Sequence, residues 1–460
     1  MGQTTAETPE QALARAVQAG TAGRAFEARG ICQDVLAANA EHPAALALMG
    51  SLAGRAGQLD EATALLERAV ARLPEVSSWH ANLCSLYRAT NRLDDALRAG
   101  QEAVRLAPDN APHRVDLGLV HLTRSENQAA QACFVQALGR DAENANAHMA
   151  LGELLLSLGE FRPGWLEYEW RNKLDQAKGT LPKMSAAAWN GMRMPGARLL
   201  LVADQGFGDM MQFARYIPRV AERVGEVVVG WGPEIVALLA GTQGVAAAYV
   251  RFADIPAHDA YCLMSSLPGI FATDLESIPW NGPYLHADPG KVAEWAARLG
   301  PRTGRRRVGL AWAGRPTHPN NARRSVRLED LAPILAVDGI EFVTVQKPVS
   351  EADQAVLRGY PRVRELSAQL GDFADTAALL ANLDLVVSVD TSVVHLAGAL
   401  GVACWVLVPR PADWRWLHGR TESPWYPSVR LFRQERPQEW GVVVEKVVDQ
   451  LRSFGNREAF

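Results

Sequence analysis

The sequence has few cysteines, and none of them lies in a close pair. No Cys-x-x-Cys motif occurs, and the five cysteines are far apart: Cys32, Cys84, Cys133, Cys262 and Cys404. Disulfide frameworks and structural zinc sites both need regularly spaced or clustered cysteines. The sequence therefore predicts neither, which suits a reducing compartment.

Long apolar runs, a strong net charge and an Asp-x-Asp motif are also missing. No apolar run is long enough to cross a bilayer, and the N-terminal MGQTTAETPEQAL has no apolar signal core. The net charge of −4 at pH 7 gives no basic surface for nucleic acid. We therefore expect a cytoplasmic protein without a membrane span or a nucleic-acid partner. The missing Asp-x-Asp agrees with a site that holds no metal.

The first third of the chain repeats itself with a period of 34 residues. The aligned segments begin at Pro9, Pro43, Ser77, Ala111 and Ala145, and small residues recur at their eighth and twentieth positions. Two antiparallel helices must approach closely at such positions. This is the tetratricopeptide pattern, an α-solenoid whose stacked helix pairs leave a concave groove. We expect the groove to bind an extended peptide or a partner protein; the alternatives are a rigid spacer and a dimerisation arm.

Beyond a linker rich in Gly and Pro, apolar strands alternate with helices. The expected strands cover residues 198–203, 226–231, 247–250, 260–263, 307–313, 341–346, 385–389 and 404–408. The apolar runs at 385–389 and 404–408 do not alternate with polar residues, as is typical of parallel strands covered on both faces. The sequence thus predicts two α/β lobes with parallel sheets.

The stretch LDLVVSVDTSVVHLAGALGVACWVLV is the most informative part of the chain. A strand ends at Asp390, and Thr391 or Ser392 can cap the short helix that follows. The first N–H groups of this helix would point outward at the carboxyl edge of the sheet, which favours phosphate. Asp390 and His395 would face the same opening at this edge of the sheet, so that a diphosphate is the natural ligand. An ordinary strand–helix–strand unit, in which Thr and Ser merely cap, explains the pattern equally well.

A second polar turn follows the strand at 198–203. In DQGFGDMMQF, Gly206 and Gly208 make a tight turn, and Asp209 opens a helix. The third Gly of a dinucleotide fingerprint is missing, which argues against a nicotinamide site. By its position alone, Asp209 is an acidic residue of the kind that helix starts favour.

The pattern VSVDTSVVHLAGALG resembles the donor-binding motif of bacterial heptosyltransferases and their relatives. In that family an Asp-Thr-Gly-x-x-His segment receives the diphosphate of a nucleotide sugar, and in this chain Ser392 replaces the Gly. The resemblance implies that Asp390, Thr391, Ser392 and His395 bind the donor. The Gly-Asp of the second turn resembles that of the family's first loop, which implies that Asp209 faces the acceptor as a general base.

The resemblance extends to the loop AGRPTHPNNARRS, which follows the strand at 307–313. Arg323 or Arg324 corresponds to the family's phosphate-binding Lys, and Arg offers a planar, two-pronged donor instead. We expect Gly314, Arg324 and Lys347 at the donor site. For Lys347, a simple surface charge is an equal alternative.

Taken over residues 198–460, the resemblance implies the GT-B fold, a pair of Rossmann-like doubly wound lobes. We expect tetratricopeptide repeats at 1–178, a linker at 179–196, an N-terminal lobe on the acceptor side at 197–302 and a C-terminal lobe on the nucleotide-sugar side at 303–460. Repeats joined to such lobes resemble bacterial protein glycosyltransferases that modify flagellin and, more distantly, the eukaryotic O-GlcNAc transferase.

The activity that this resemblance implies is that of an inverting, metal-independent glycosyltransferase. It would move a sugar from a nucleotide-sugar donor to a hydroxyl group, on a protein acceptor such as flagellin that the repeats hold. No cofactor is expected. Two alternatives remain open: a nucleotide-sugar epimerase or hydrolase, and a non-catalytic repeat scaffold with a degenerate transferase domain.

Overall fold

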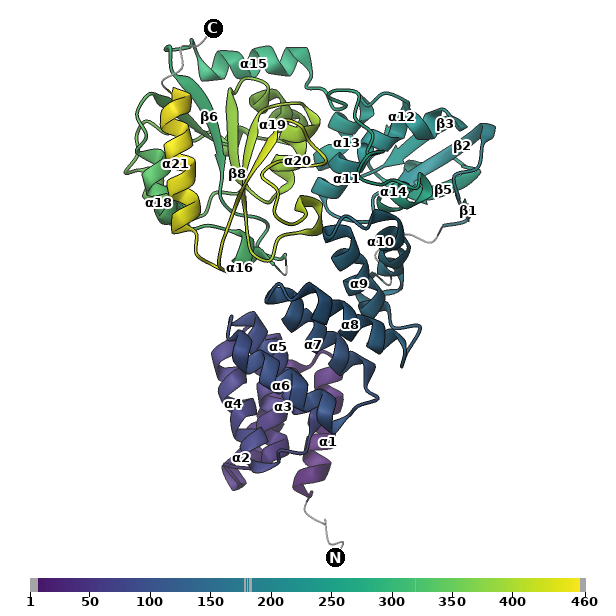
Figure 1. Cartoon of the computed structure of the whole chain (residues 1–460), viewed down its shortest axis with the longest axis vertical. Helices are drawn as coiled ribbons and strands as arrows, with labels where there is room; N and C mark the ends of the chain where they lie inside the picture. The colour runs from purple at the N-terminus through teal and green to yellow at the C-terminus, as the bar shows by residue number, and fades with distance from the viewer. Residues whose placement is uncertain (1–6, 178, 180, 182–183, 319, 456–460) are drawn as a thin grey trace, which may run out of the picture. The chain divides into compact units, whose positions relative to one another are not determined.

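The chain divides into two compact units, which we call the helical unit, Met1–Leu154, and the α/β unit, Leu155–Phe460 (Figure 1). The division lies earlier in the chain than the repeat boundary expected at residue 178. The structure, a computed structural model, describes residues 7–177, 179, 181, 184–318 and 320–455. Within this described part, no helix is both long and apolar enough to span a membrane.

The helical unit is an array of antiparallel helix pairs, and the first helix of each pair starts at a predicted repeat start. This confirms the 34-residue period as the structural period. The helices are α1 Pro9–Thr21, α2 Ala25–Ala38, α3 Pro43–Arg55, α4 Leu59–Arg72, α5 Ser77–Ala89, α6 Leu93–Leu106, α7 Ala111–Thr123, α8 Asn127–Leu138 and α9 Ala145–Ser157, the last of which runs past the division.

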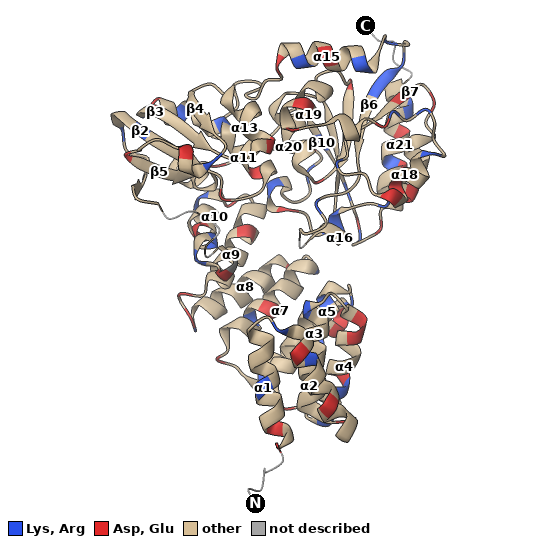
Figure 2. Cartoon of the chain, turned by 180° about the vertical axis from the view of Figure 1, so that it is seen from behind, with Lys and Arg blue, Asp and Glu red and all other residues tan. Residues whose placement is uncertain are grey.

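Small residues stand where the two helices of a pair touch. A Cβ atom at Gly50 would lie 3.0 Å from Leu66 Cγ and 3.0 Å from the carbonyl oxygen of Ala62, and one at Gly118 would lie 2.5 Å from the Phe134 ring. Charged residues of both signs are spread over the exposed helix faces (Figure 2). Exposed ion pairs contribute at most about 1 kcal/mol each. The array therefore depends on its close helix contacts rather than on its surface charges.

The α/β unit contains two five-stranded parallel sheets. Their strand orders are β1-β5-β2-β3-β4 and β10-β9-β8-β6-β7. The strands are β1 Ala187–Ala188, β2 Met194–Val202, β3 Val224–Gly230, β4 Val245–Tyr249, β5 Ala260–Leu263, β6 Arg306–Ala311, β7 Ile340–Thr344, β8 Leu385–Val389, β9 Cys404–Val408 and β10 Val429–Arg433. The sequence did not predict β1, which is two residues long, or β10, an edge strand in which charged residues interrupt the apolar run.

Helices cover these sheets and connect their strands. They are α10 Phe161–Tyr168, α11 Phe207–Phe213, α12 Ile217–Ala221, α13 Pro233–Ala240, α14 Leu267–Ile270, α15 Pro289–Leu299, α16 Asn321–Arg324, α17 Ala332–Leu335, α18 Glu351–Leu357, α19 Phe373–Leu380, α20 Ser392–Ala399 and α21 Gly441–Gly455. The long helix α21, yellow in Figure 1, packs Val443, Val447 and Leu451 into the core of the second sheet.

Each sheet reverses its strand order at one place. In the first sheet β2 lies between β3 and β5, and in the second sheet β6 lies between β7 and β8. Loops that leave the carboxyl ends of the strands at such a point border a crevice, where open α/β sheets bind their ligands. The polar segments 204–209, 312–325 and 390–395 leave β2, β6 and β8 respectively, so all three lie at these reversal points.

The segment that follows the repeats is anchored in the α/β unit by aromatic contacts. The Trp165 ring of α10 lies 5.3 Å from that of Trp414 and 6.4 Å from that of Trp425, between ring centroids. Phe161 stacks on Trp425 at 5.7 Å. The Trp165 indole N–H also donates a hydrogen bond of 2.9 Å to the Thr273 carbonyl. These contacts explain why α10 belongs to the α/β unit.

A buried ion pair connects the same segment to the first reversal point. Arg171 donates to Asp204, with a distance of 2.9 Å between Nε and Oδ2, and both side chains are 2% exposed. Arg171 also donates to Ser266 Oγ at 2.6 Å. Asp204 in turn accepts from the Ser265 N–H at 3.1 Å. The pair therefore holds the start of the 204–209 loop against the end of β5.

We expect the substitution Arg171→Met to lower the free energy of unfolding by about 3 to 5 kcal/mol, because it leaves the Asp204 carboxylate buried without its charged partner. Urea denaturation followed by tryptophan fluorescence measures the change. Arg162→Met is the matched control: Arg162 is 71% exposed and pairs with Asp274, so its loss costs less than about 1 kcal/mol. Equal losses in the two variants would contradict this account.

Candidate functional site

The loop after β2 and the helix after β8 meet at a glycine. A Cβ atom at Gly208 would lie 2.6 Å from Cδ2 of His395, so no residue larger than glycine fits there without displacing the imidazole. The N-terminal part of α11 therefore packs directly on α20 (Figure 1). The two segments that the sequence singled out independently are thus neighbours in the folded chain.

Asp209 lies in the first turn of α11 and has two partners. Its Oδ2 accepts a hydrogen bond of 3.0 Å from the Gly206 N–H, as a helix-start carboxylate does. Its Oδ1 accepts from Nη2 of Arg415 in a close ion pair. Burial raises the pKa of the Asp209 carboxyl above its usual value, against the opposing effect of the Arg415 guanidinium. The helix-start role expected of Asp209 is therefore present, together with an ion pair that the sequence did not predict.

Arg415 is the centre of this cluster. Its Nε donates to Gln212 Oε1 at 2.6 Å, its Nη1 donates to Asp413 Oδ1 at 2.8 Å, and its Nη2 donates to Asp209. Its guanidinium also lies 4.3 Å from the centre of the Trp414 ring. Neither Arg415 nor Asp413 was among the site residues predicted from the sequence. The available signal was the segment ADWRWLHGR, in which an arginine stands between two tryptophans in a polar loop after a buried strand.

Asp390 follows β8 and is nearly buried, with 8% of its surface exposed. Burial and the nearby Asp413 carboxylate raise the pKa of Asp390 to about 6. The Trp416 side chain and the guanidinium groups of Arg324 and Arg415 oppose this shift. Keeping Asp390 ionised at neutral pH thus costs the protein stability, a situation that is common at functional sites.

Thr391 and Ser392 begin α20, but neither caps it in the way that the sequence suggested. Thr391 occupies the N-cap position, and its side chain makes no capping hydrogen bond. The reason is that its hydroxyl pairs with Ser388 Oγ on β8, at 3.2 Å. The N–H groups of the first turn of α20 therefore receive no side-chain cap from Thr391, at the carboxyl edge of the second sheet.

His395 is buried one turn into α20. Its Nδ1 is 2.9 Å from the Tyr426 hydroxyl, and its ring stacks on Trp416 with 5.7 Å between centroids. Burial lowers the pKa of His395 well below its usual value, and the guanidinium groups of Arg415, Arg215 and Arg324 lower it further. The imidazole is therefore neutral across the physiological pH range.

Gly314 and Arg324 are in contact in the loop after β6. A Cβ atom at Gly314 would lie 2.6 Å from Nη2 of Arg324, so a larger residue would displace the guanidinium from this position. Arg324 Nε is buried and has no hydrogen-bond partner in the described part of the chain. The same holds for Nε2 of Gln212, the residue whose Oε1 binds Arg415. Two N–H donors near Asp390 and Asp209 thus have no acceptor.

Lys347 has a different environment. Its Nζ donates to the carbonyl oxygens of Leu370 and, at 3.3 Å, of Gly371. Within the described residues, no hydrogen bond or ion pair joins Lys347 to Asp390 or Arg324. Among these described residues there is also no group of three or more His, Cys, Asp or Glu residues that could hold a metal ion.

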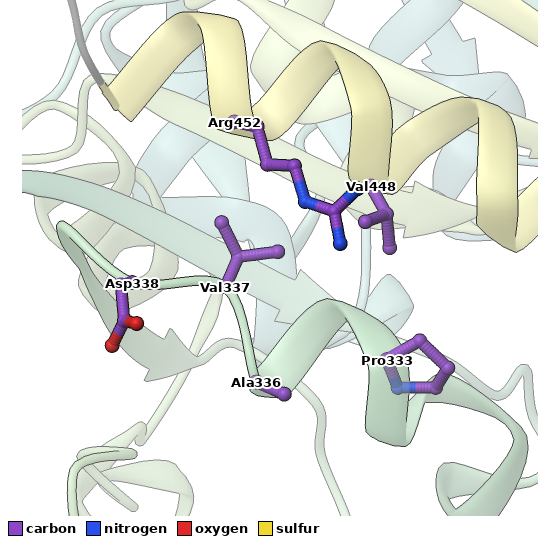
Figure 3. A pocket seen from close by; sticks show the side chains of 6 residues that line it. All are labelled: Pro333, Ala336, Val337, Asp338, Val448 and Arg452. Carbon is purple, nitrogen blue, oxygen red and sulfur yellow. The ribbon is translucent and has the colours of Figure 1, made fainter.

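A separate pocket lies on the second sheet, between α17 and α21. It has a volume of about 450 Å³ and is lined by Pro333, Ala336, Val337, Asp338, Val448 and Arg452 (Figure 3). Its walls are mostly aliphatic, with one acidic and one basic residue. None of the predicted site residues lines it.

The raised pKa of Asp390 predicts a pH-dependent effect of Asp390→Asn. An acid whose pKa rises on folding weakens the fold as the pH rises, because the folded state still holds the proton where the unfolded chain has released it. The parent protein therefore loses stability as the pH rises from the usual carboxyl pKa to about 6. We therefore expect the variant to gain about 2 to 3 kcal/mol relative to the parent between about pH 4.5 and about pH 8.

Urea denaturation of both proteins at the two pH values measures this gain. Asp338→Asn is the control, because the Asp338 side chain is 93% exposed and should show no such change. A stability difference between Asp390→Asn and the parent that is the same at both pH values would refute the assignment.

Comparison with known proteins identifies the repeats. Residues 47–111 and 115–161 match the tetratricopeptide repeat family, so the repeats predicted from the sequence period are confirmed. Among solved structures, a thermophilic TPR protein of Thermus thermophilus is 25% identical, covering 37% of this chain and 93% of its own, with a TM-score of 0.33. YrrB, described as a TPR protein with an unusual peptide-binding site, is 16% identical, covering 38% and 90%, with a TM-score of 0.31.

One relative matches over a longer part of the chain. Protein FlbA of Caulobacter vibrioides is 27% identical over an alignment of 391 residues, which covers 76% of this chain and 62% of FlbA. The chain therefore spans less than two thirds of that relative's length. An alignment of 391 residues is longer than the helical unit, so it also includes residues of the α/β unit. The chain is thus a tetratricopeptide repeat array joined to an α/β unit that has a distant counterpart in FlbA.

Proposed function

We propose that the α/β unit is an inverting, metal-independent glycosyltransferase with a GT-B arrangement of its two sheets. The donor would be a nucleotide sugar, and the acceptor a hydroxyl group on a protein. Tetratricopeptide repeats indicate a role in binding a protein partner. We propose that the repeats hold the protein acceptor, of which flagellin is one example, and that the enzyme works in the cytoplasm without a cofactor.

The observation that carries this proposal is the meeting of three loops around Asp390. They leave β2, β6 and β8, and they bring together Arg324 and the uncapped start of α20, beside Arg415 of the loop after β9. Arg324 Nε and Gln212 Nε2 are buried donors without acceptors among the described residues. A diphosphate supplies several acceptor oxygens and negative charge, so it would satisfy these donors and the helix N-terminus together.

In the proposed reaction Asp209 is the general base. Each carboxylate oxygen has a second lone pair, so that Asp209 can accept the acceptor's proton while Gly206 and Arg415 hold it in place. Burial makes this carboxylate more basic than an exposed one, which favours proton transfer near neutral pH. The leaving diphosphate would be stabilised by the N-terminus of α20 and by Arg324, in place of a metal ion.

The first test concerns nucleotide binding. We expect Arg324→Ala to weaken binding of the nucleoside diphosphate about 10- to 100-fold, because one charge-assisted contact to phosphate contributes about 1.5 to 3 kcal/mol. A thermal-shift screen with ADP, UDP, GDP and CMP sugars selects the ligand, and titration calorimetry measures its affinity. Arg323→Ala, the neighbouring position on α16, is the matched control. Equal affinities of the two variants would place the phosphate elsewhere.

The second test concerns transfer. Asp209→Asn keeps the shape of the side chain but cannot accept the acceptor's proton, so we expect kcat to fall about 100-fold or more while nucleotide affinity changes less than about threefold. Transfer is measured with and without EDTA, and we expect no effect of the chelator. Turnover of the variant close to that of the parent would remove Asp209 as the base.

The same assays separate the two alternatives. Product release without an acceptor would indicate an epimerase or hydrolase, and nucleotide binding without turnover would indicate a scaffold with a degenerate transferase domain.

A further inference from the structure

Arg215 is a fully buried cation without a carboxylate partner among the described residues. It follows α11 and is 4% exposed. Its Nε donates to the Gln212 carbonyl at 2.8 Å, its Nη1 to the Trp425 carbonyl at 2.8 Å, and its Nη2 to the Tyr284 hydroxyl at 2.9 Å. All these hydrogen-bond acceptors are neutral oxygens.

Such a charge is expensive to bury, and packing alone does not require it. Replacing buried ionic groups by apolar residues of similar size is often neutral or stabilising. Here the guanidinium lies over three aromatic rings, 4.9 Å from the centre of Tyr284, 5.2 Å from that of Trp425 and 4.8 Å from that of Tyr426. The faces of these rings partly offset the desolvation of the cation. Stability alone therefore does not explain why a cation is buried here, and the residues next to Arg215 indicate another role.

The Arg215 contacts lead to His395. The Tyr284 hydroxyl accepts from Arg215 and donates to the Gln212 carbonyl at 3.4 Å, whereas the Tyr426 hydroxyl is 2.9 Å from Nδ1 of His395. Burial raises the pKa of both tyrosines, so both keep their protons. The Tyr284 N–H also donates to the Ala399 carbonyl at 3.0 Å, which fixes its loop beside α20. Tyr426 is thus in contact with both the Arg215 guanidinium and the His395 imidazole.

We propose that Arg215, through Tyr426, is a positioning group that holds His395 as the neutral tautomer with its proton on Nε2. The guanidinium lies 4.8 Å from the centre of the Tyr426 ring, while Tyr284 accepts from Arg215 and donates its own hydrogen bond to the Gln212 carbonyl. The adjacent positive charge makes the Tyr426 hydroxyl a better donor and disfavours a proton on the facing Nδ1. Tyr426 therefore donates to Nδ1, and the imidazole presents an N–H group at its other nitrogen.

The Nε2 side of the ring faces the point where the two loops meet. A Cβ atom at Gly208 would lie 3.3 Å from Nε2. His395 thus offers the ligand an N–H donor that stays neutral across the physiological pH range. The cations Arg324 and Arg415 lie nearby and also lower the pKa of His395. This binding role rests on the proposed function, because it assumes an anionic ligand at the site. The assignment of the tautomer does not rest on the proposed function.

Two-bond hydrogen–nitrogen correlation spectra of the full chain labelled with ¹⁵N-histidine test the tautomer. His395→Gln identifies the His395 signals by their loss. We expect a proton on Nε2 and none on Nδ1 throughout the range from about pH 5.5 to about pH 8. A proton on Nδ1, or a doubly protonated ring near pH 7, would overturn the proposal.

Two substitutions test the route. Tyr426→Phe removes only the hydroxyl next to Nδ1, and we expect it to produce a mixture of tautomers. Tyr216→Phe is the matched control, because the Tyr216 hydroxyl is equally buried but binds Thr273, at 2.8 Å. Arg215→Met should shift the mixture in the same direction as Tyr426→Phe. Unchanged His395 signals in Tyr426→Phe would overturn the proposal that Arg215 acts on His395 through Tyr426.

Inorganic pyrophosphate tests the binding role separately, by titration calorimetry. We expect Tyr426→Phe to bind it about 5- to 10-fold more weakly than Tyr216→Phe does. Equal affinities of the two variants would overturn the role of His395 in binding. If the parent protein bound neither pyrophosphate nor a nucleotide, the proposed function would fail, whereas the spectra would still decide the tautomer.

Discussion

The site depends on the burial of one guanidinium group. Arg415 donates to Asp209 and Gln212 on α11 and to Asp413 in its own loop, so that it joins the loop after the second sheet's strand β9 to the helix that follows β2. Without it, the Asp209 carboxylate would be buried with only the Gly206 N–H as a partner. Removing one member of such a group leaves the others desolvated and unpaired, which costs several kcal/mol. The charges around Asp390 are therefore arranged as a connected set, not as independent pairs.

This set is not optimised for stability. The pKa of Asp390 is raised by burial and by Asp413, and His395 is kept neutral by burial and by surrounding guanidinium groups. Two buried donors, Arg324 Nε and Gln212 Nε2, have no acceptor among the described residues. The buried pair of Arg171 and Asp204, by contrast, is matched. Strain that is concentrated in one place is expected where a ligand completes the arrangement.

Glycines make three close approaches at the site possible, one of which lies between the loops of the two sheets. Gly208 leaves room for the His395 ring, Gly314 for the Arg324 guanidinium, and Gly398 for the Tyr426 ring, which a Cβ atom would approach to 2.4 Å. In each case the glycine is needed for the space that it leaves, not for its backbone conformation. A larger side chain at Gly208 would push α11 away from α20, and one at Gly398 would displace Tyr426 from His395.

Much of this architecture could be predicted from the sequence, because the signals involved are local. The 34-residue period follows from small residues within single helix pairs, and buried parallel strands such as 385–389 and 404–408 show as mainly apolar runs without alternation. The polar turns at Asp209 and Asp390 could be placed at strand ends for the same reason. Edge strand β10, in which charged and apolar residues mix, carried a weaker signal.

The partners of those turns were decided by the tertiary structure alone. Asp209 and Arg415 are 206 positions apart, and no local pattern indicates that they pair. Thr391 could cap its helix by its position in the sequence, yet its hydroxyl binds Ser388 on β8 instead. The sequence by itself determined which elements form and which turns are polar. Only the packing of the two sheets' loops decided which charges are buried together, because burial and pairing depend on neighbours that are distant along the chain.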